Sequence, residues 1–182
     1  MEFETSKHYL EEVRRQFRGY KRMGEGAMAQ LRDEDFFVTL DPEANSVAIL
    51  VKHLAGNMRS RWTDFLTTDG EKPSRNRDSE FEEPPATRTE LKALWDDGWR
   101  CLFTALEGLT DADLVRTITI RGEAHSVMQA INRQVAHYSY HCGQVVFLAK
   151  HLCAGRWRIL SVPLGKSAEF NRRVQSGEAS QR

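Results

Sequence analysis

The chain has 182 residues, of which 26 are basic and 26 are acidic, so its formal net charge is zero. This length suits one domain with a sizeable core, and the balanced charge gives no field to attract a nucleic-acid backbone or an anionic membrane surface. No apolar run approaches the roughly 20 residues that span a bilayer, and the charged start MEFETSKHYLEEVRR lacks the apolar core of a signal peptide. We therefore expect neither a nucleic-acid nor a membrane partner.

Helical periodicity marks four long segments of the chain. In the first segment, apolar residues recur every three or four positions from Leu10 to Leu31. The second segment begins after Asn45 or Ser46, because both residue types are good N-caps, and it ends near Gly70. Each segment carries one apolar stripe, which predicts an amphipathic helix.

Residues 67–86 interrupt the helical pattern with three prolines and mixed charges, which excludes a regular element there. A loop of this length in a small domain is usually functional or disordered. Its arginines Arg75 and Arg77 could form a lid that binds an anionic group of a substrate. Alternatively, the loop is solvated and pinned to the core by Phe81. The sequence favours neither interpretation.

The third helix begins at Thr87, and Glu90 three positions later completes a capping-box pattern. After this helix, residues 115–125 contain the β-branched run TITI followed by the turn signal RG. This pattern predicts a small β-hairpin. Ser126 and Gln129 then form a second capping box, which starts a fourth helix that runs to about residue 154.

Four amphipathic helices that cannot bury their stripes alone most simply form a four-helix bundle, so the predicted fold class is all-α. We expect a single domain over residues 1–175 and a disordered tail over 176–182. The three cysteines, Cys101, Cys142 and Cys153, lie in apolar periodic segments. This placement favours reduced, mostly buried thiols and a cytoplasmic location over one disulfide with one free thiol.

The fourth helix contains HYSYHCGQ, in which His137 and His141 are four residues apart and therefore share one helix face. Gln134 and Gln144 lie on the same stripe and could orient the imidazoles by hydrogen bonds. Two histidines at this spacing could hold a metal ion, or they could be ordinary residues at the rim of a core. The helix is not the HExxH helix of metalloproteases, because its glutamate base is missing.

A third histidine, His53, lies on the apolar stripe of the second helix and should point inward. If the second and fourth helices are neighbours, His53 faces the histidine pair. Three imidazoles without a fourth protein ligand match an open, catalytic type of metal site, and zinc and nickel both accept imidazole nitrogen. Asn57 and Arg61 continue the stripe and could bind substrate at a pocket mouth, or form a solvated helix end. Three other histidines fit surface or cap positions: His8, His125 and His151.

With its inward histidine, its HxxxH pair and the following Gly143-Gln144, the chain resembles the DinB-like superfamily of bacterial metal-dependent proteins, which includes the YfiT-type thiol transferases. The resemblance covers about residues 2–173. A closer resemblance is to a branch of unknown function, carried by NSVAILVKHLAGNMRSRWTDFLTTDGEKPSRNRDSEFE and PLGKSAEFN. It implies an up-down-down-up bundle, a divalent metal held by His53, His137 and His141, and commonly a homodimer.

The resemblance also implies an activity, in which a small bacterial thiol such as mycothiol or bacillithiol is joined to an electrophile. Hydrolysis by a metal-activated water is a variant of this enzymatic hypothesis. A different class of function is a non-catalytic metal-binding bundle of the stress response. For the homodimer, we expect interface aromatics among Trp95, Trp99 and Tyr140.

Overall fold

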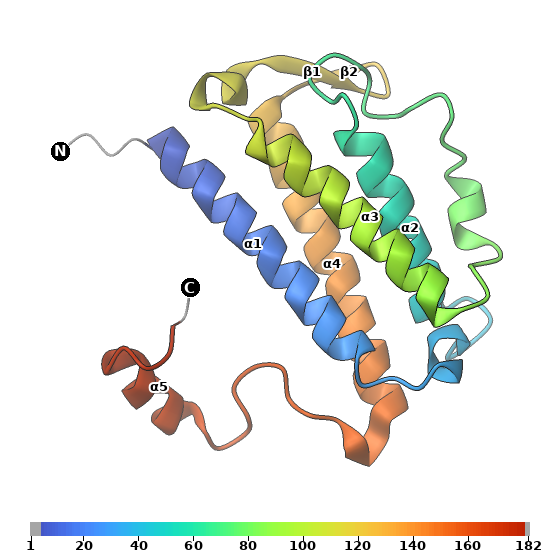
Figure 1. Cartoon of the computed structure of the whole chain (residues 1–182), viewed down its shortest axis with the longest axis vertical. Helices are drawn as coiled ribbons and strands as arrows, with labels where there is room; N and C mark the ends of the chain where they lie inside the picture. Colours follow the sequence, from blue (N-terminus) through green and yellow to red (C-terminus); the bar gives the residue numbers. More distant parts are fainter. Residues whose placement is uncertain (1–4, 181–182) are drawn as a thin grey trace.

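The computed structural model describes residues 5–180, with side chains from residue 8 onward. Residues 1–4 of the predicted domain and 181–182 of the predicted tail lie outside the described residues. Four long helices form the body of the molecule (Figure 1), namely α1 (Thr5–Met28), α2 (Val47–Trp62), α3 (Arg88–Glu107) and α4 (Val127–Cys153). A short helix, α5 (Ser167–Gln175), follows at the end of an extended segment and lies away from the bundle (Figure 1).

Helices α1 and α4 run in one direction along the bundle axis and α2 and α3 in the opposite direction (Figure 1), which is the up-down-down-up connectivity that the resemblance implied. Helix α2 packs mainly against α3, while α1 packs mainly against α4. Helices α2 and α3 run in parallel, so the segment between them must travel back along the whole length of the bundle (Figure 1). The predicted all-α four-helix bundle is confirmed.

The helix starts follow the capping signals in the sequence. The Ser46 hydroxyl accepts a hydrogen bond from the backbone N–H of Ile49, and capping boxes join Thr87 to Glu90 and Ser126 to Gln129. Each cap satisfies backbone N–H groups that have no partner within the helix. The predicted beginnings of the last three bundle helices are therefore confirmed.

The predicted hairpin is also present, as β1 (Thr117–Ile120) paired antiparallel with β2 (Glu123–Ser126). Arg121 and Gly122 form its two-residue turn with φ values of 57° and 77°. Such positive values at both central positions are typical of a turn whose twist matches that of the strands. The hairpin lies across one end of the bundle, immediately before α4 (Figure 1).

Short 3₁₀ helices occupy several connections: η1 (Glu34–Phe37), η2 (Asp78–Phe81), η3 (Asp111–Val115) and η4 (Ala154–Arg156). The expectation that residues 67–86 hold no regular element is wrong at η2. Lys52 of α2 donates hydrogen bonds to the carbonyl groups of Ser79 and Glu83 and so holds this single turn in place. Because a residue of another helix stabilises the turn, its own sequence shows no helical periodicity.

An aromatic cluster fills the middle of the core, where the rings of Phe17, Trp62, Trp99 and Tyr138 meet at centroid distances of 5.7–6.4 Å. The expectation that Trp95 and Trp99 contribute to a dimer interface is wrong, because both are buried within the chain. They lie four residues apart on the stripe of α3 that faces the core. Tyr140, the third aromatic of that expectation, is exposed.

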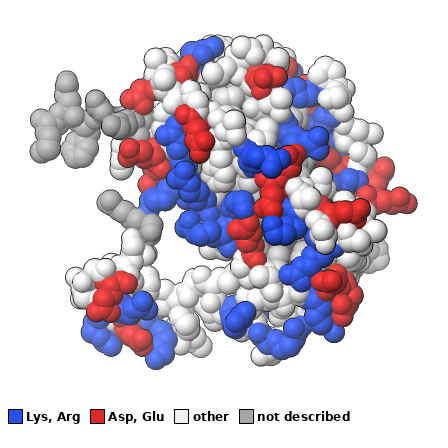
Figure 2. Space-filling view, in the orientation of Figure 1, with Lys and Arg blue, Asp and Glu red and all other residues white. Residues whose placement is uncertain are grey.

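The surface carries both charge signs, and Figure 2 shows acidic and basic side chains interspersed over one face of the bundle. All three cysteines are free thiols, of which Cys142 and Cys153 are buried and Cys101 is partly exposed. Among residues 5–180, no helix combines the length and apolarity that a membrane crossing requires.

Candidate metal centre

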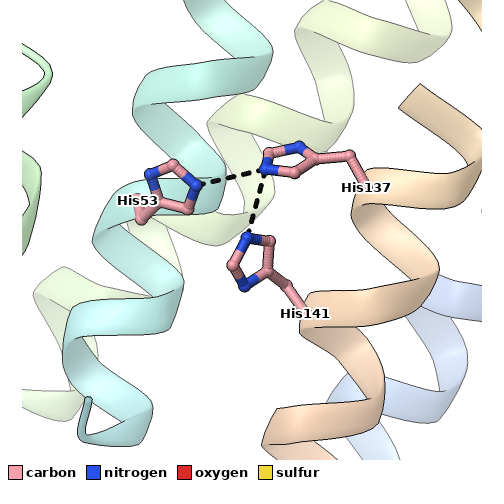
Figure 3. Close-up of side chains that lie close together, drawn as sticks. All are labelled: His53, His137 and His141. Atoms are coloured by element: carbon pink, nitrogen blue, oxygen red, sulfur yellow. Dashed lines mark hydrogen bonds between the residues drawn. The ribbon is translucent and has the colours of Figure 1, made fainter. Parts of the chain in front are cut away.

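Helices α2 and α4 bring three imidazoles together inside the bundle (Figure 3). His53 comes from α2, and His137 and His141 come from successive turns of α4. The Nε2 atom of His137 lies 3.3 Å from Nε2 of His53 and 3.1 Å from Nε2 of His141. One ligand atom from each of the three residues can be chosen so that all lie within 4.8 Å of one another. Helices α2 and α4 are therefore neighbours, as predicted, and their three histidines form one cluster.

These distances fit a bound cation. Three nitrogens that bind a zinc ion tetrahedrally at about 2.0–2.1 Å lie about 3.3 Å from one another. Two of the nitrogen pairs already have this separation. The cluster therefore needs little rearrangement to hold a divalent ion.

The outer nitrogens of two rings have hydrogen-bond partners. His53 Nδ1 lies 2.8 Å from Glu80 Oε2, and His141 Nδ1 lies 2.7 Å from Gln144 Oε1. Both partners are acceptor oxygens, so each Nδ1 carries a hydrogen, and in the neutral form of each ring Nε2 presents a lone pair to the centre. His137 Nδ1 is buried and has no hydrogen-bond partner among the described residues.

Burial favours the neutral form of the cluster. It lowers the pKa of His137 to about 3, and repulsion from His141 and His53 acts in the same direction. Burial also lowers the pKa of His141 to about 4, against the raising effect of its hydrogen bond to Gln144. Both imidazoles are therefore uncharged at neutral pH, which is the form that binds metal ions.

Residues 63–87 connect α2 to α3 and are called the crossing segment below. This segment adds a charged residue to the histidine cluster. Glu80 is 5% exposed, and Arg75 donates to both of its carboxylate oxygens, with Nε 2.7 Å from Oε1 and Nη2 2.8 Å from Oε2. Burial raises the pKa of Glu80, but the hydrogen bonds from His53 and Arg75 outweigh burial and hold the pKa below its ordinary value. Glu80 is therefore an anion in contact with the histidine cluster.

The segment itself packs against the cluster. The ring of Phe81 lies 4.6 Å from that of His53, centroid to centroid. Arg75 also forms an ion pair with Glu71, at 3.2 Å. Because the Arg75 guanidinium is buried between two carboxylates, it is not free to bind an anionic substrate. Of the two interpretations of the loop, the contacts favour the one in which Phe81 pins it.

The residues predicted to bind substrate have structural partners. Asn57 is 5% exposed, and its Oδ1 accepts a hydrogen bond from the Tyr138 hydroxyl. Arg61 is 6% exposed and donates to the carbonyl group of Gly70 and to Glu71, although its Nε has no partner among the described residues. Substrate binding by these two residues stays a prediction.

The two predicted glutamines differ in their contacts. Gln144 accepts from His141 as described above, and its amide nitrogen donates to Tyr140. Gln134 is buried, and its Oε1 makes no hydrogen bond to the described residues. The remaining histidines lie apart from the cluster, since His8 and His151 are exposed and His125 bonds to the hairpin backbone.

The fold and the site together define an all-α bundle protein whose three inward histidines could hold a metal ion. The family model described as "Protein of unknown function (DUF1572)" matches residues 4–166, and the chain therefore belongs to this family. No curated protein and no solved structure matches the chain.

Proposed function

We propose that the protein is a metal-dependent enzyme in which His53, His137 and His141 hold a divalent ion, zinc or nickel. The observation that carries the proposal is the convergence of three imidazoles inside the bundle, with Nε2 of His137 3.3 Å from that of His53 and 3.1 Å from that of His141. No fourth His, Cys, Asp or Glu belongs to this group within the part of the chain that the structure describes. A three-ligand set of this kind is typical of catalytic rather than structural zinc.

We further propose that the family is a branch of the DinB-like superfamily. The up-down-down-up bundle, with one histidine on α2 facing an HxxxH pair on α4, supports this relation. The proposed reaction is then the transfer of a small bacterial thiol to an electrophile. All three cysteines are free thiols, which supports a cytoplasmic location. Small thiols are kept reduced in that compartment.

If His53, His137 and His141 hold a divalent ion, that ion would supply acidification of a bound thiol or water, which would give a nucleophile near neutral pH. The protein residues supply position. The low pKa values of His137 and His141 keep both rings free of protons that would compete with an ion. Gln144 holds the His141 ring with its Nε2 toward the centre, as Glu80 does for His53.

The first test is metal binding. The wild-type chain should bind about one zinc or nickel ion, and the double variant His137→Ala/His141→Ala should lose it, because one helix face provides both ligands. His151→Ala is a matched control, since this histidine is exposed on the same helix. Elemental analysis after dialysis measures the content. Equal metal content in the double variant and the wild type would rule out this site.

The second part of the test separates the activities. The metal-loaded protein is screened with small thiols for a shift in thermal unfolding, and thiol consumption is then followed with a panel of electrophiles. Consumption that needs both metal and thiol supports the transferase. Turnover of esters or amides without a thiol supports hydrolysis instead. Metal binding with neither activity supports the non-catalytic metal-binding bundle.

A further inference from the structure

A buried carboxylate reaches the histidine cluster from the segment that crosses between α2 and α3. Both oxygens of Glu80 are occupied, because His53 and Arg75 share Oε2 and Arg75 also binds Oε1. The side chains of Glu80 and Arg75 are 7% and 5% exposed. Glu80 thus bridges a candidate metal ligand and a buried cation.

Fold stability alone does not account for this arrangement. Burying an ion pair removes two charges from water, and well-packed apolar residues in its place are often as stable or more so. The backbone nevertheless makes room for the carboxylate. A Cβ atom at Gly56 of α2 would overlap the Glu80 side chain and lie 2.8 Å from its Cδ. Glycine at this helical position is what allows Glu80 to lie against the helix next to His53.

The hydrogen bond determines which nitrogen of His53 faces the centre. An ionised carboxylate only accepts hydrogen bonds, so His53 Nδ1 must be the donor. The Nε2 lone pair is then directed at His137 Nε2, 3.3 Å away. Without Glu80, either ring nitrogen of His53 could carry the hydrogen, and the ring could turn.

We propose that Glu80, clamped by Arg75, is a positioning residue for the metal centre, which holds His53 in the Nδ1–H tautomer with Nε2 free for the ion. The claim that Glu80 supports metal binding rests on the proposed function, whereas the claim that Glu80 fixes the His53 tautomer does not. One consequence is that the crossing segment belongs to the site: its order and the occupancy of the site stabilise each other.

The tautomer is measured on the metal-free protein by long-range ¹H–¹⁵N NMR of the imidazoles. Wild type should show His53 with its hydrogen on Nδ1, and Glu80→Ala should show a mixture of both tautomers. Glu80→Gln should restore the Nδ1–H form in large part, since its amide oxygen still accepts a hydrogen bond. The control is Glu82→Gln, a change of the same chemistry at an exposed position two residues away.

Zinc affinity is measured by competition with a chromophoric chelator. Loss of such an outer hydrogen-bond partner weakens metal binding by about 10–100-fold in other sites. We expect a loss of this size in Glu80→Ala, a smaller loss in Glu80→Gln, and none in Glu82→Gln. Gly56→Ala should also weaken binding, because its methyl group displaces Glu80 without removing any charged group.

Gly56→Ala also separates positioning from general destabilisation. Alanine inside a helix is intrinsically more favourable than glycine. Weaker zinc binding with an unchanged or raised unfolding midpoint would therefore come from the displaced carboxylate. This variant, with Glu80→Gln, keeps the inference testable even if Glu80→Ala does not fold.

The outcomes are distinct. Glu80 is not a positioning residue if the His53 tautomer and the zinc affinity are the same in wild type, Glu80→Ala and Gly56→Ala. If wild type binds neither zinc nor nickel, the proposed function falls and the metal part of the inference falls with it. The metal-free tautomer then still decides whether Glu80 positions His53.

Discussion

Tyr138, next to the first histidine of α4, joins the two helices that carry the site. Its hydroxyl accepts a hydrogen bond from Trp62 Nε1 and donates one to Asn57 Oδ1, both at 3.0 Å, and the side chain is fully buried. The hydroxyl thereby satisfies two polar groups that are also buried. The tyrosine thus fixes α2 against α4 one turn away from the metal centre.

At this scale we predict that Tyr138→Phe destabilises the fold by about 1–3 kcal/mol, because Trp62 Nε1 and Asn57 Oδ1 both lose their partner in a buried place. Urea unfolding followed by circular dichroism measures the change. Tyr140→Phe is the control, since that side chain is exposed and its change should stay within about 0.5 kcal/mol. Equal stability of Tyr138→Phe and wild type would mean that water or another group replaces the hydroxyl.

The site residues illustrate what local spacing can indicate. The four-residue spacing of His137 and His141 and the inward stripe that contains His53 follow from helical periodicity, so the cluster could be predicted. Glu80 has no comparable signal in the sequence. It contacts His53 across 27 positions of sequence, through a segment with no repeating pattern. Its position depends on how that segment folds back on α2, which no local signal encodes.

At the scale of the secondary-structure elements, the carboxylate of Asp69 joins the hairpin to the crossing segment. Asp69 accepts hydrogen bonds from the backbone N–H groups of Glu71, Arg121 and Gly122, at 2.6, 2.8 and 2.8 Å. Gly70 adds a backbone hydrogen bond to Thr119, at 2.8 Å. The start of the crossing segment is therefore attached to the turn of the hairpin.

These hydrogen bonds hold the pKa of Asp69 well below its ordinary value, the bonds from Glu71 and Gly122 having the largest effect. The folded state therefore binds the proton less readily than the unfolded chain, whose aspartate pKa is about 3.9. The stabilisation by Asp69 is present in full above that pKa and is lost as the pH falls toward the folded-state pKa.

We predict that Asp69→Asn lowers the free energy of unfolding by about 1–2 kcal/mol at pH 7. The difference from wild type should shrink as the pH falls below about 4. Urea unfolding at several pH values measures this difference, with Asp78→Asn as the control because that side chain is 92% exposed. A difference that stays constant down to pH 2 would show that the charge of Asp69 is not responsible.

The elements differ in how far the sequence predicts them. Helices α2, α3 and α4 and the hairpin could be predicted because their start signals act within three or four residues, as at Ser46, Thr87 and Ser126. No pattern in the sequence predicts helix α5. It has nine residues and no side-chain hydrogen bond at its N-cap, Lys166, so neither its length nor a cap distinguishes it from a loop.

At the scale of the whole molecule, the apolar core is distinct from the histidine cluster. Its buried apolar residues come from all four bundle helices. We therefore predict that a chelator leaves the helical circular-dichroism spectrum and the cooperative unfolding intact and lowers stability only by the binding term, about 2.7 kcal/mol for metal at 100 times its Kd. Thermal unfolding with and without chelator measures this. Loss of the helical spectrum on chelation would make the ion structural.

We also propose that the protein is a homodimer. Tyr140 and Phe147 of α4 are 62% and 64% exposed, and large exposed apolar side chains of this kind favour an interface. Light scattering at micromolar concentration should give twice the mass of the chain, and Tyr140→Ser/Phe147→Ser should shift it toward the single mass. Wild type at the single mass under these conditions would contradict the proposal.

The pairing of α1 with α4 has a consequence for the order in which the molecule is made. During synthesis, α2 and α3 can pair as soon as both have left the ribosome, whereas α1, which packs mainly against α4, completes its packing only when α4 follows. Two of the three histidines arrive with that last bundle helix. The nascent chain therefore cannot capture an ion in this site early, and metal loading must follow the closing of the bundle.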